Sequence, residues 1–258
     1  MDALPWLALT VILAACSTPS VRAASTRELR LMSYNLNYGN PDWDSTLDAI
    51  DNADADVVLL QEVTSSWKAA LAKRFDDKYP HQKYRVDGRA AGGLAVLSKL
   101  PIDREELWPA PAGTGAWFPL GRVVIAAPFG KVQLLNVHLR PALDSRGWVT
   151  GYLTTPPIRR AEIEAHWKRV TLELPTIVIG DFNEEPDGKA IEFLTGKGLA
   201  RVPTSGPKSW RYVRDNVEVL KLDIDHVMID DRLTASNAHV VDAGASDHRP
   251  VVVTIAPK

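Results

Sequence analysis

The 258-residue sequence contains one cysteine, Cys16, so no disulfide bond can form within the chain. A strong charge of either sign is also missing. The formal net charge is −2 at pH 7, which excludes a global basic field that would attract nucleic acid but not a local basic groove. With 45% hydrophobic and 24% charged residues, the chain has the composition of a globular protein and the length to bury a sizeable core.

The first apolar run, Trp6 to Ala15, is too short for a membrane-spanning helix and has the length of a signal-peptide core. It leads into Leu13-Ala14-Ala15-Cys16, which resembles the lipobox of bacterial lipoproteins, where the cysteine is lipidated and becomes the new N-terminus. Positive charge is missing ahead of this run. The chain begins with Asp2 and no lysine or arginine, whereas export signals normally begin positive.

These features predict three segments. Residues 1–16 form a lipoprotein-type signal peptide, residues 17–27 a flexible tether, and residues 28–258 the folded domain. We therefore expect an exported bacterial protein in the periplasm or cell envelope, held at a membrane by a lipid on Cys16. Cleavage near Val21-Arg22-Ala23 is the alternative, and it would release a secreted protein.

From Glu28 onward, short β-branched runs alternate with helical patterns. Helices are predicted at residues 43–53, 65–79, about 158–172 and about 189–195. Strands are predicted at residues 29–37, 56–63, 83–87, 93–99, 103–108, 121–127, 131–139, 176–183, 223–230, 237–243 and 250–256. Strand–helix units at both ends and a β-rich middle predict a single α+β domain, with two packed sheets covered by helices.

Polar side chains stand at or near the ends of most of these apolar runs. One such end, for example Asp181-Phe182-Asn183, can be ordinary turn chemistry. Several together predict that the strand ends converge on a polar site. The residues concerned are Asn35, Gln61, Glu62, Asn136, His138, Asp181, Asn183, Asp223, Asp225, His226, Asp247 and His248.

This ordered set resembles the motifs of the endonuclease/exonuclease/phosphatase superfamily, the deoxyribonuclease-I-like metal-dependent phosphoesterases. The motifs are an Asn after the first strand, Gln-Glu after the second, then "GGLAVLSKLPI", "NVHL", "GDFN", "DIDHV" and "SDH". They span about residues 29–255. The resemblance implies a four-layer sandwich, in which two mainly antiparallel β-sheets are flanked by helices. It also implies hydrolysis of phosphate esters with a divalent metal, Mg²⁺ or else Mn²⁺.

The resemblance assigns three residues to the metal. Phosphate-ester hydrolysis needs charge neutralisation on the phosphoryl oxygens, and Mg²⁺ prefers one or two carboxylates together with water and substrate oxygens. Glu62 is expected to be the principal ligand, with Asn35 beside it as a direct or water-bridged neighbour. Asp247 is expected to be a second metal contact or an orienting group. A solvated strand-end carboxylate at Glu62 and a turn-forming Asn35 are the structural alternatives.

Five further residues are expected to carry the chemistry. Asp181 would orient or deprotonate the attacking water, and Asn183 would donate a hydrogen bond to the phosphoryl group. Asp225 would pair with His248, which would act as a base or as an electrostatic clamp on the phosphate. His138 would contact the phosphate or serve as general acid. A plain turn at Asp181 and a hydrogen-bonded core histidine at His138 are the alternatives.

Residues 140–160 form the least family-like segment, a long insertion between two predicted elements. Long irregular loops in compact domains are often functional, so we expect this one to wall the substrate cleft. Arg140, Trp148 and Tyr152 are the candidate contacts, the two aromatic rings stacking on a base or a sugar. A self-packed surface loop is the alternative. The Trp117-Phe118 pair is expected to fill a core or sheet edge rather than to contact a membrane.

The sequence thus predicts an exported, metal-dependent phosphoesterase acting on phosphodiesters, either a nuclease on DNA or RNA or a related phosphodiesterase. The near-neutral charge counts against a polymeric substrate. One alternative is a phosphatase or a phospholipase-type, sphingomyelinase-like enzyme acting on a small or lipid phosphate. Another is a non-catalytic binding protein on the same fold, against which the intact set of acids and histidines argues. Beyond the substrate and the membrane at Cys16, no obligate protein partner is indicated.

Overall fold

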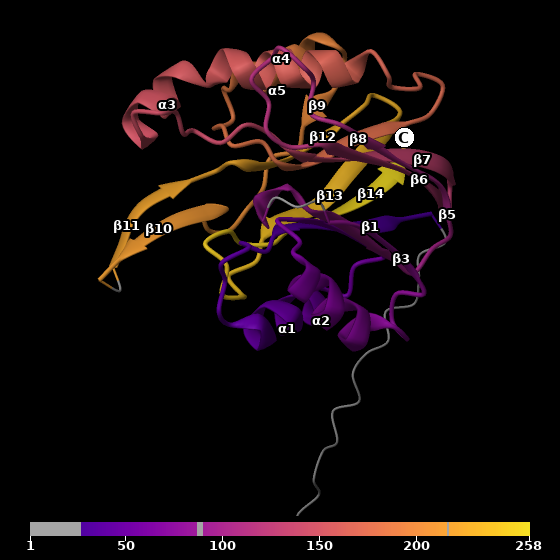
Figure 1. Ribbon diagram of the computed structural model, residues 1–258. Helices are drawn as coiled ribbons and strands as arrows, with labels where there is room; N and C mark the ends of the chain where they lie inside the picture. The colour runs from indigo at the N-terminus through magenta and orange to yellow at the C-terminus, as the bar shows by residue number, and fades with distance from the viewer. Residues whose placement is uncertain (1–26, 87–89, 216) are drawn as a thin grey trace, which may run out of the picture.

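Two six-stranded β-sheets lie face to face in the computed structural model, with helices on both outer faces (Figure 1). The structure describes residues 27–86, 90–215 and 217–258; the predicted signal peptide, Cys16 and most of the tether lie outside these residues. The elements are β1 (Leu29–Asn35), α1 (Trp43–Ala53), β2 (Val57–Gln61), α2 (Ser65–Phe75), β3 (His81–Arg85), η1 (Ala90–Gly92), β4 (Leu94–Ser98), β5 (Ile102–Trp108), β6 (Leu120–Ala127), β7 (Gly130–His138), α3 (Trp148–Thr154), α4 (Pro156–Trp167), β8 (Thr176–Asp181), α5 (Lys189–Gly196), β9 (Ala200–Arg201), β10 (Trp210–Arg214), β11 (Val217–Leu222), β12 (Asp225–Ile229), β13 (Leu233–Val240) and β14 (Val251–Pro257).

The first sheet has the strand order β13-β14-β1-β2-β4-β3, and the second has the order β5-β6-β7-β8-β12-β9. Each sheet contains one parallel pair, β1 with β2 and β7 with β8. The remaining neighbours are antiparallel. The predicted fold class, two mainly antiparallel sheets in a four-layer α+β sandwich, is therefore confirmed.

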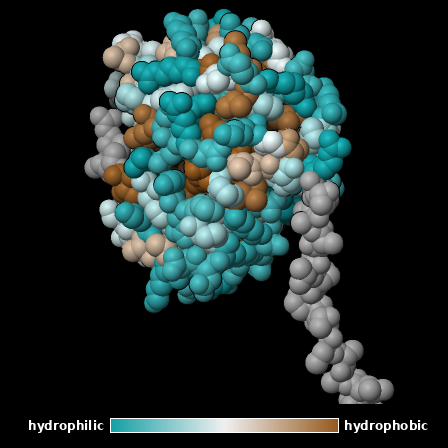
Figure 2. All heavy atoms as spheres, turned by 90° about the vertical axis from the view of Figure 1, so that its right-hand side faces the viewer, coloured by the Kyte–Doolittle hydropathy of each residue, from teal (hydrophilic) through white to brown (hydrophobic). Residues whose placement is uncertain are grey.

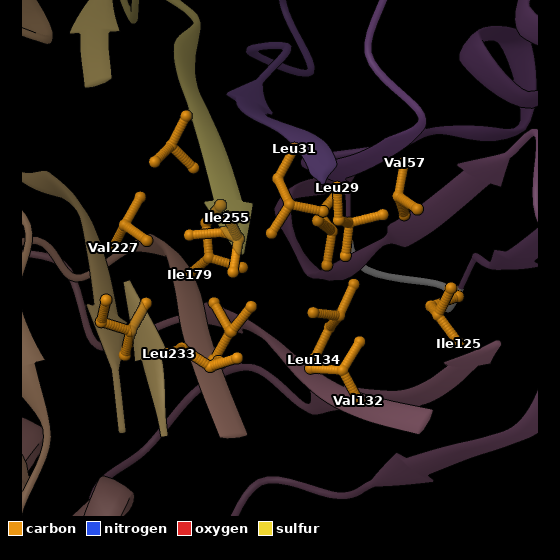
Figure 3. Close-up of a cluster of buried hydrophobic side chains, with 14 of the residues drawn as sticks. Leu29, Leu31, Val57, Ile125, Val132, Leu134, Ile179, Val227, Leu233 and Ile255 are labelled. Carbon is orange, nitrogen blue, oxygen red and sulfur yellow. The ribbon is translucent and has the colours of Figure 1, made fainter. Parts of the chain in front are cut away.

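The inner layer of the sandwich is built by alternate residues of the central strands. Leu29 and Leu31 of β1 and Val57 of β2 point from the first sheet toward Leu134 and Ile179 of the second (Figure 3). Because side chains alternate between the faces of a strand, the intervening residues point outward. Apart from Arg30 in β1, most of these are apolar too, which explains why β2 and β8 read as nearly continuous hydrophobic runs.

Helices cover the outward-facing residues of both sheets. On the first sheet, Trp67, Leu71 and Phe75 of α2 and Ile50 of α1 pack on Met32 and its neighbours. On the second sheet, α4 and α5 cover β7, β8 and β12 with a separate apolar cluster. Both central strands of each sheet are thereby buried on both faces, which holds the strand ends in fixed positions.

Helix boundaries follow local chemistry where the sequence offers a cap. Helix α1 matches its predicted range, and the Asp42 carboxylate caps it by accepting from the Ser45 N–H. Helix α2 begins at Ser65 after a Thr64 cap, not a serine cap, and ends at Phe75, earlier than predicted.

The prediction of an irregular loop at residues 140–160 was wrong. The segment contains α3, and α4 already begins at Pro156. Gly151 explains part of the difference, because a Cβ at this position would lie 2.6 Å from the Ala142 carbonyl oxygen. Helix α3 thus packs closely on the chain before it, and this tertiary contact outweighs weak local helix propensity.

A hairpin of β10 and β11 was not predicted either. It forms a separate two-stranded sheet and projects away from the sandwich on the same side as α3 (Figure 1).

The face turned toward the viewer in Figure 2 is mostly hydrophilic, with hydrophobic residues in smaller groups across its middle and upper part. Within the described residues, no helix has both the length and the apolar character needed to cross a membrane.

Candidate active site

The directions of the strands bring the predicted polar residues to one edge of the sandwich. Strands β1 and β2 run parallel, with Asn35 paired to Gln61, so Asn35 and the following Glu62 emerge together. Strands β7 and β8 are parallel as well, with His138 paired to Asp181. Strand β12 runs the opposite way and starts at Asp225, directly opposite Asp181. The convergence expected from the sequence is therefore present.

Asn35 links the two sheets at this edge. Its amide Nδ2 donates to Glu62 Oε1 at 3.3 Å and to Asp181 Oδ2 at 3.0 Å. Its Oδ1 accepts from the Asn37 N–H at 3.0 Å and so faces away from the carboxylates. In this arrangement Asn35 holds two carboxylates in place.

Glu62 stands in a left-handed backbone conformation, with φ of 58°. This conformation is uncommon for a residue other than glycine and tends to occur at functional sites. It turns the side chain back toward Asn35, while Oε2 accepts from the Tyr38 N–H at 2.9 Å. Burial raises the pKa of Glu62, so the carboxylate would gain from a neighbouring cation.

Asp225, His248 and Asp181 form a buried row of acid, imidazole and acid. His248 Nδ1 lies 2.9 Å from Asp225 Oδ2, and His248 Nε2 lies 3.6 Å from Asp181 Oδ2. Burial alone would lower the pKa of His248, but the carboxylates of Asp225 and Asp181 raise it well above its usual value. His248 is therefore an imidazolium at neutral pH, donating through Nδ1 to Asp225.

Asp181 lies at the centre of the site, with 1% of its surface exposed. Burial raises its pKa to about 7, Asp225 adds to this, and the charge on His248 opposes it. Its Oδ1 accepts from the Asn183 N–H at 2.8 Å. A carboxylate that titrates near neutral pH is suited to exchange a proton with water.

His138 is buried between Phe118 and the carboxylates. Its Nδ1 lies 3.1 Å from the Ala91 carbonyl oxygen, which can only accept, so Nδ1 carries the proton. Burial, together with the charge on His248, lowers the pKa of His138 to about 3. Of its two expected roles, this arrangement disfavours the general acid, because Nε2 faces the site as an acceptor.

Asn183 and Asp247 flank this centre. The Asn183 side chain lies in the cleft and donates one amide N–H to the Leu139 carbonyl at 3.0 Å, which leaves its second N–H for a ligand. Asp247 Oδ1 accepts from Asn37 Nδ2 at 2.8 Å, and Asp247 Oδ2 accepts from the Trp210 indole N–H at 2.9 Å. Asn37 and Trp210 were not predicted as site residues.

Buried polar contacts behind the site fix the separation of the sheets. Gln61 Nε2 donates to Asn136 Oδ1 across the sandwich at 2.7 Å, and Asn136 Nδ2 donates to the Leu60 carbonyl at 3.1 Å.

Gly180 precedes Asp181 with φ of 145°, and a Cβ there would lie 2.1 Å from the Val137 carbonyl oxygen. The glycine of the "GDFN" motif thus lets β8 approach β7 closely enough to place Asp181.

Asp223 and His226 lie outside the centre. Asp223 pairs with Lys208 at 2.6 Å, and His226 is buried with Nε2 2.9 Å from the Glu184 carbonyl oxygen. His226 is therefore a core residue and is not part of the centre.

The donor atoms at this edge suit a hard divalent cation. His138 Nε2 faces Asp181 Oδ2 at 3.5 Å and Glu62 Oε1 at 3.8 Å with no proton of its own between them. Asp225 Oδ1 is buried without a hydrogen-bond partner. Ligand atoms of Asp181, Asp225 and His248 lie within 4.8 Å of one another, but the charged His248 ring has no free lone pair, so the two carboxylates are the available ligands of this group. Facing acceptors and a carboxylate oxygen without a hydrogen-bond partner would be satisfied by a divalent cation.

The centre forms the floor of a cleft of about 800 Å³. Glu62, His138, Asp181, Asn183, Asp247 and His248 contribute to this floor. The lining also includes a group of apolar residues, here called the apolar wall: Trp117, Phe118, Trp148, Val149, Tyr152, Leu153, Trp210, Leu220 and Leu222. Among the described residues that line the cleft, none is a lysine or an arginine.

The three expected substrate contacts from the insertion are placed differently. Trp148 and Tyr152 of α3 line the cleft and are about half exposed. Arg140 is buried behind the wall: its guanidinium lies 3.2 Å from the centroid of the Trp117 ring and donates to the Leu143 carbonyl. The guanidinium supports the wall and does not face the cleft. Phe118 is buried against the His138 ring, with centroids 4.2 Å apart.

Solved structures share this fold across most of the chain. An endonuclease/exonuclease/phosphatase family protein from Bacteroides thetaiotaomicron superposes with a TM-score of 0.67 at 18% identity, covering 90% of this chain and 98% of the other. Sphingomyelinase C from Streptomyces griseocarneus gives 0.60 at 21% identity, with coverage of 88% and 99%. TDP2 from C. elegans gives 0.63 at 17% identity, with coverage of 89% and 75%. At these identities the likeness shows the fold alone.

None of the curated proteins matched the chain. The sequence profile of the Endonuclease/Exonuclease/phosphatase family, however, matches residues 32–248, which include every element that contributes to the cleft floor. The chain therefore belongs to the endonuclease/exonuclease/phosphatase family and is a phosphoesterase.

Proposed function

We propose that this phosphoesterase is a divalent-metal-dependent phosphodiesterase. The observation that carries the proposal is the convergence of Glu62, Asp181 and the Asp225–His248 pair from both sheets onto one cleft floor. A bound Mg²⁺ or Mn²⁺ would supply charge neutralisation on the phosphoryl oxygens. Glu62 and Asp247 would hold this ion, and Asn35 would keep the Glu62 carboxylate in place.

The remaining groups would handle the proton and the phosphoryl charge. The raised pKa of Asp181, about 7, suits a group that accepts a proton from the attacking water near neutral pH. His248 is already charged, which favours the electrostatic clamp over the general base among its two expected roles. The free amide N–H of Asn183 would donate to a phosphoryl oxygen.

The substrate within this class is also a proposal. A nuclease acting on DNA or RNA is the first candidate from the sequence, and a lipid or other small diester is the second. The described lining of the cleft supports the second, because it carries aromatic and aliphatic side chains and no cation for further phosphates. The fold shared with a sphingomyelinase C is compatible with that choice.

The test uses the folded domain with three substrates. Hydrolysis of bis(p-nitrophenyl) phosphate, hydrolysis of p-nitrophenyl phosphate and nicking of supercoiled plasmid are followed with Mg²⁺, Mn²⁺ or chelator. Diester cleavage that is lost with chelator supports the proposal, and plasmid nicking would make the enzyme a nuclease. Activity on the monoester alone would replace the phosphodiesterase with a phosphatase. No activity on any of the three would contradict the proposal.

Export and anchoring are proposed on the sequence of the N-terminal segment. The lipobox-like Leu13-Ala14-Ala15-Cys16 supports a lipid anchor at Cys16 that holds the enzyme at the cell envelope. In a bacterial host, the full-length chain is expected in the membrane fraction, and Cys16→Ser is expected in the soluble extracytoplasmic fraction. Persistent membrane association of the variant would contradict a lipid anchor.

A further inference from the structure

The apolar wall exposes side chains that a globular protein normally covers. Val149 and Leu153 of α3 are 81% and 73% exposed, and Trp148 is 58% exposed. Leu220 of β11 completes this surface from the hairpin and is also exposed. Single exposed apolar residues are ordinary, but a group gathered along one cleft marks a ligand surface.

Two rings join the helix side and the hairpin side of the wall. Trp148 of α3 and Trp210 of β10 lie nearly parallel, with centroids 6.3 Å apart and planes at 26°. Trp210 is fixed, because its indole N–H donates to Asp247 Oδ2 and its backbone bridges to His248. The wall therefore stands at a defined position next to the cleft floor, where a phosphate would lie.

The charged groups that line the described cleft are acids and histidines. Glu185 lies in its lining together with the acids of the floor, whereas the Glu184 carboxylate is buried and paired with Arg159 at 3.1 Å. A polynucleotide presents one phosphate per residue and gains most of its affinity from lysine and arginine contacts to them. In the described part of this cleft, a second phosphate would meet carboxylates or apolar side chains, which do not stabilise it. An uncharged apolar group would instead cover the apolar wall and remove its side chains from water, which is favourable.

From these observations we propose that the enzyme selects a phosphodiester bearing an apolar ester group beside the scissile phosphate. Trp148 and Leu153 are the specificity-determining residues. The inference rests on the proposed phosphodiesterase function and names its substrate class. Trp210 also holds Asp247, so a substitution there would change the cleft floor as well as the wall.

The experiment compares p-nitrophenyl diesters that share one reporter leaving group and differ in the second ester group. The methyl, phenyl and 5′-thymidyl esters are hydrolysed by the folded domain with Mg²⁺, and kcat/KM is measured for each. The variants are Trp148→Ala and Leu153→Ala. Leu172→Ala is the matched control, because Leu172 is 65% exposed but lies outside the cleft lining.

The wild-type enzyme is expected to prefer the phenyl over the methyl ester by roughly tenfold in kcat/KM, the discrimination that burial of a small apolar group supplies. Trp148→Ala should lower this preference by at least about threefold, Leu153→Ala by less, and Leu172→Ala should leave it unchanged. Added oligonucleotide should not inhibit hydrolysis.

Equal kcat/KM for the phenyl and methyl esters, a preference unaffected by Trp148→Ala, or strong inhibition by oligonucleotide would overturn the inference. In each of these results, hydrolysis of the methyl ester would leave the phosphodiesterase function standing. Absence of hydrolysis for every ester would overturn the proposed function, and the inference with it.

Discussion

Replacing Asp181 by asparagine should separate the chemistry of the site from the stability of the fold. Asp181 is 1% exposed, and burial raises its pKa from 3.8 to about 7. Because the folded pKa lies above the unfolded one, wild-type stability is lost as pH rises between these two values. A difference of about three pH units corresponds to roughly 4 kcal/mol at pH 8, and to almost nothing near pH 4.

The uncharged side chain of Asp181→Asn avoids this cost of burying a charge, but it also loses part of the hydrogen bonding of Asp181. Asp181 accepts from Asn35 on one oxygen and from Asn183 on the other, whereas an asparagine has a single acceptor oxygen. Loss of one hydrogen bond costs about 1–2 kcal/mol. Asp181→Asn should therefore be more stable than the wild type by roughly 2–3 kcal/mol at pH 8, which raises Tm by roughly 5–10 °C. Near pH 4 it should be slightly less stable.

Thermal melts of both proteins in the presence of chelator, from pH 4 to pH 8, measure this difference without a bound metal. Diester hydrolysis by the same variant should fall by roughly 10²- to 10⁴-fold. Asp230→Asn is the matched control: Asp230 is a buried acid at the far end of β12 that accepts from the Thr176 N–H. This control should be destabilised at both pH values and remain active.

A stability difference between Asp181→Asn and wild type that is negative at pH 8, or that does not change with pH, would refute the reasoning. So would hydrolysis within tenfold of the wild type. Either result would make Asp181 a structural residue.

Three further predictions concern the surroundings of Asp181. The Asp225 carboxylate raises the pKa of His248, so Asp225→Asn should lower that pKa. Activity that needs the charged imidazole should then disappear at a lower pH on the alkaline side of the kcat/KM profile. An unchanged profile would contradict the Asp225–His248 pairing. Trp210→Phe keeps an aromatic ring but removes one donor to Asp247, so kcat should fall by roughly tenfold, with a small loss of Tm from the smaller ring. Full activity would show that this hydrogen bond does not position the carboxylate. Gly180→Ala places a Cβ 2.1 Å from a carbonyl oxygen of β7 at φ of 145°, so the variant should lose several kcal/mol of stability in denaturant unfolding, and a wild-type midpoint would contradict the close approach.

Much of the site could be predicted because its residues follow strands whose ends must meet. Asn35 and Glu62 are 27 positions apart, yet both emerge at one edge because β1 and β2 are parallel. His138 and Asp181 are paired for the same reason in the other sheet. The apolar runs and the polar residues that end them are both visible in the sequence.

The roles of single atoms could not be predicted in this way. The sequence does not show that Asn35 turns its amide nitrogen toward the carboxylates, or that the His138 proton is held by a backbone carbonyl. Arg140 was expected in the cleft, but the ring of Trp117 covers its guanidinium. These outcomes depend on which neighbours the fold supplies.

The sequence does contain a feature from which the hairpin of β10 and β11 could have been predicted. Trp210, Tyr212 and Val213 precede Asp215-Asn216, two residue types that favour turns, and Val217 and Val219 follow. Helix α3 left no such signal, because glycine and threonine give its residues weak helix propensity. Its helix depends on packing around Gly151, which only the folded chain provides.

The measurement that tests the account most directly is hydrolysis of bis(p-nitrophenyl) phosphate before and after removal of divalent metal. Chelator should abolish the activity, added Mg²⁺ should restore it, and Glu62→Gln should need a higher Mg²⁺ concentration for half-maximal rate. Full hydrolysis in chelator, or a Glu62→Gln variant with the wild-type response to Mg²⁺, would contradict a metal-dependent phosphodiesterase built on these strand ends.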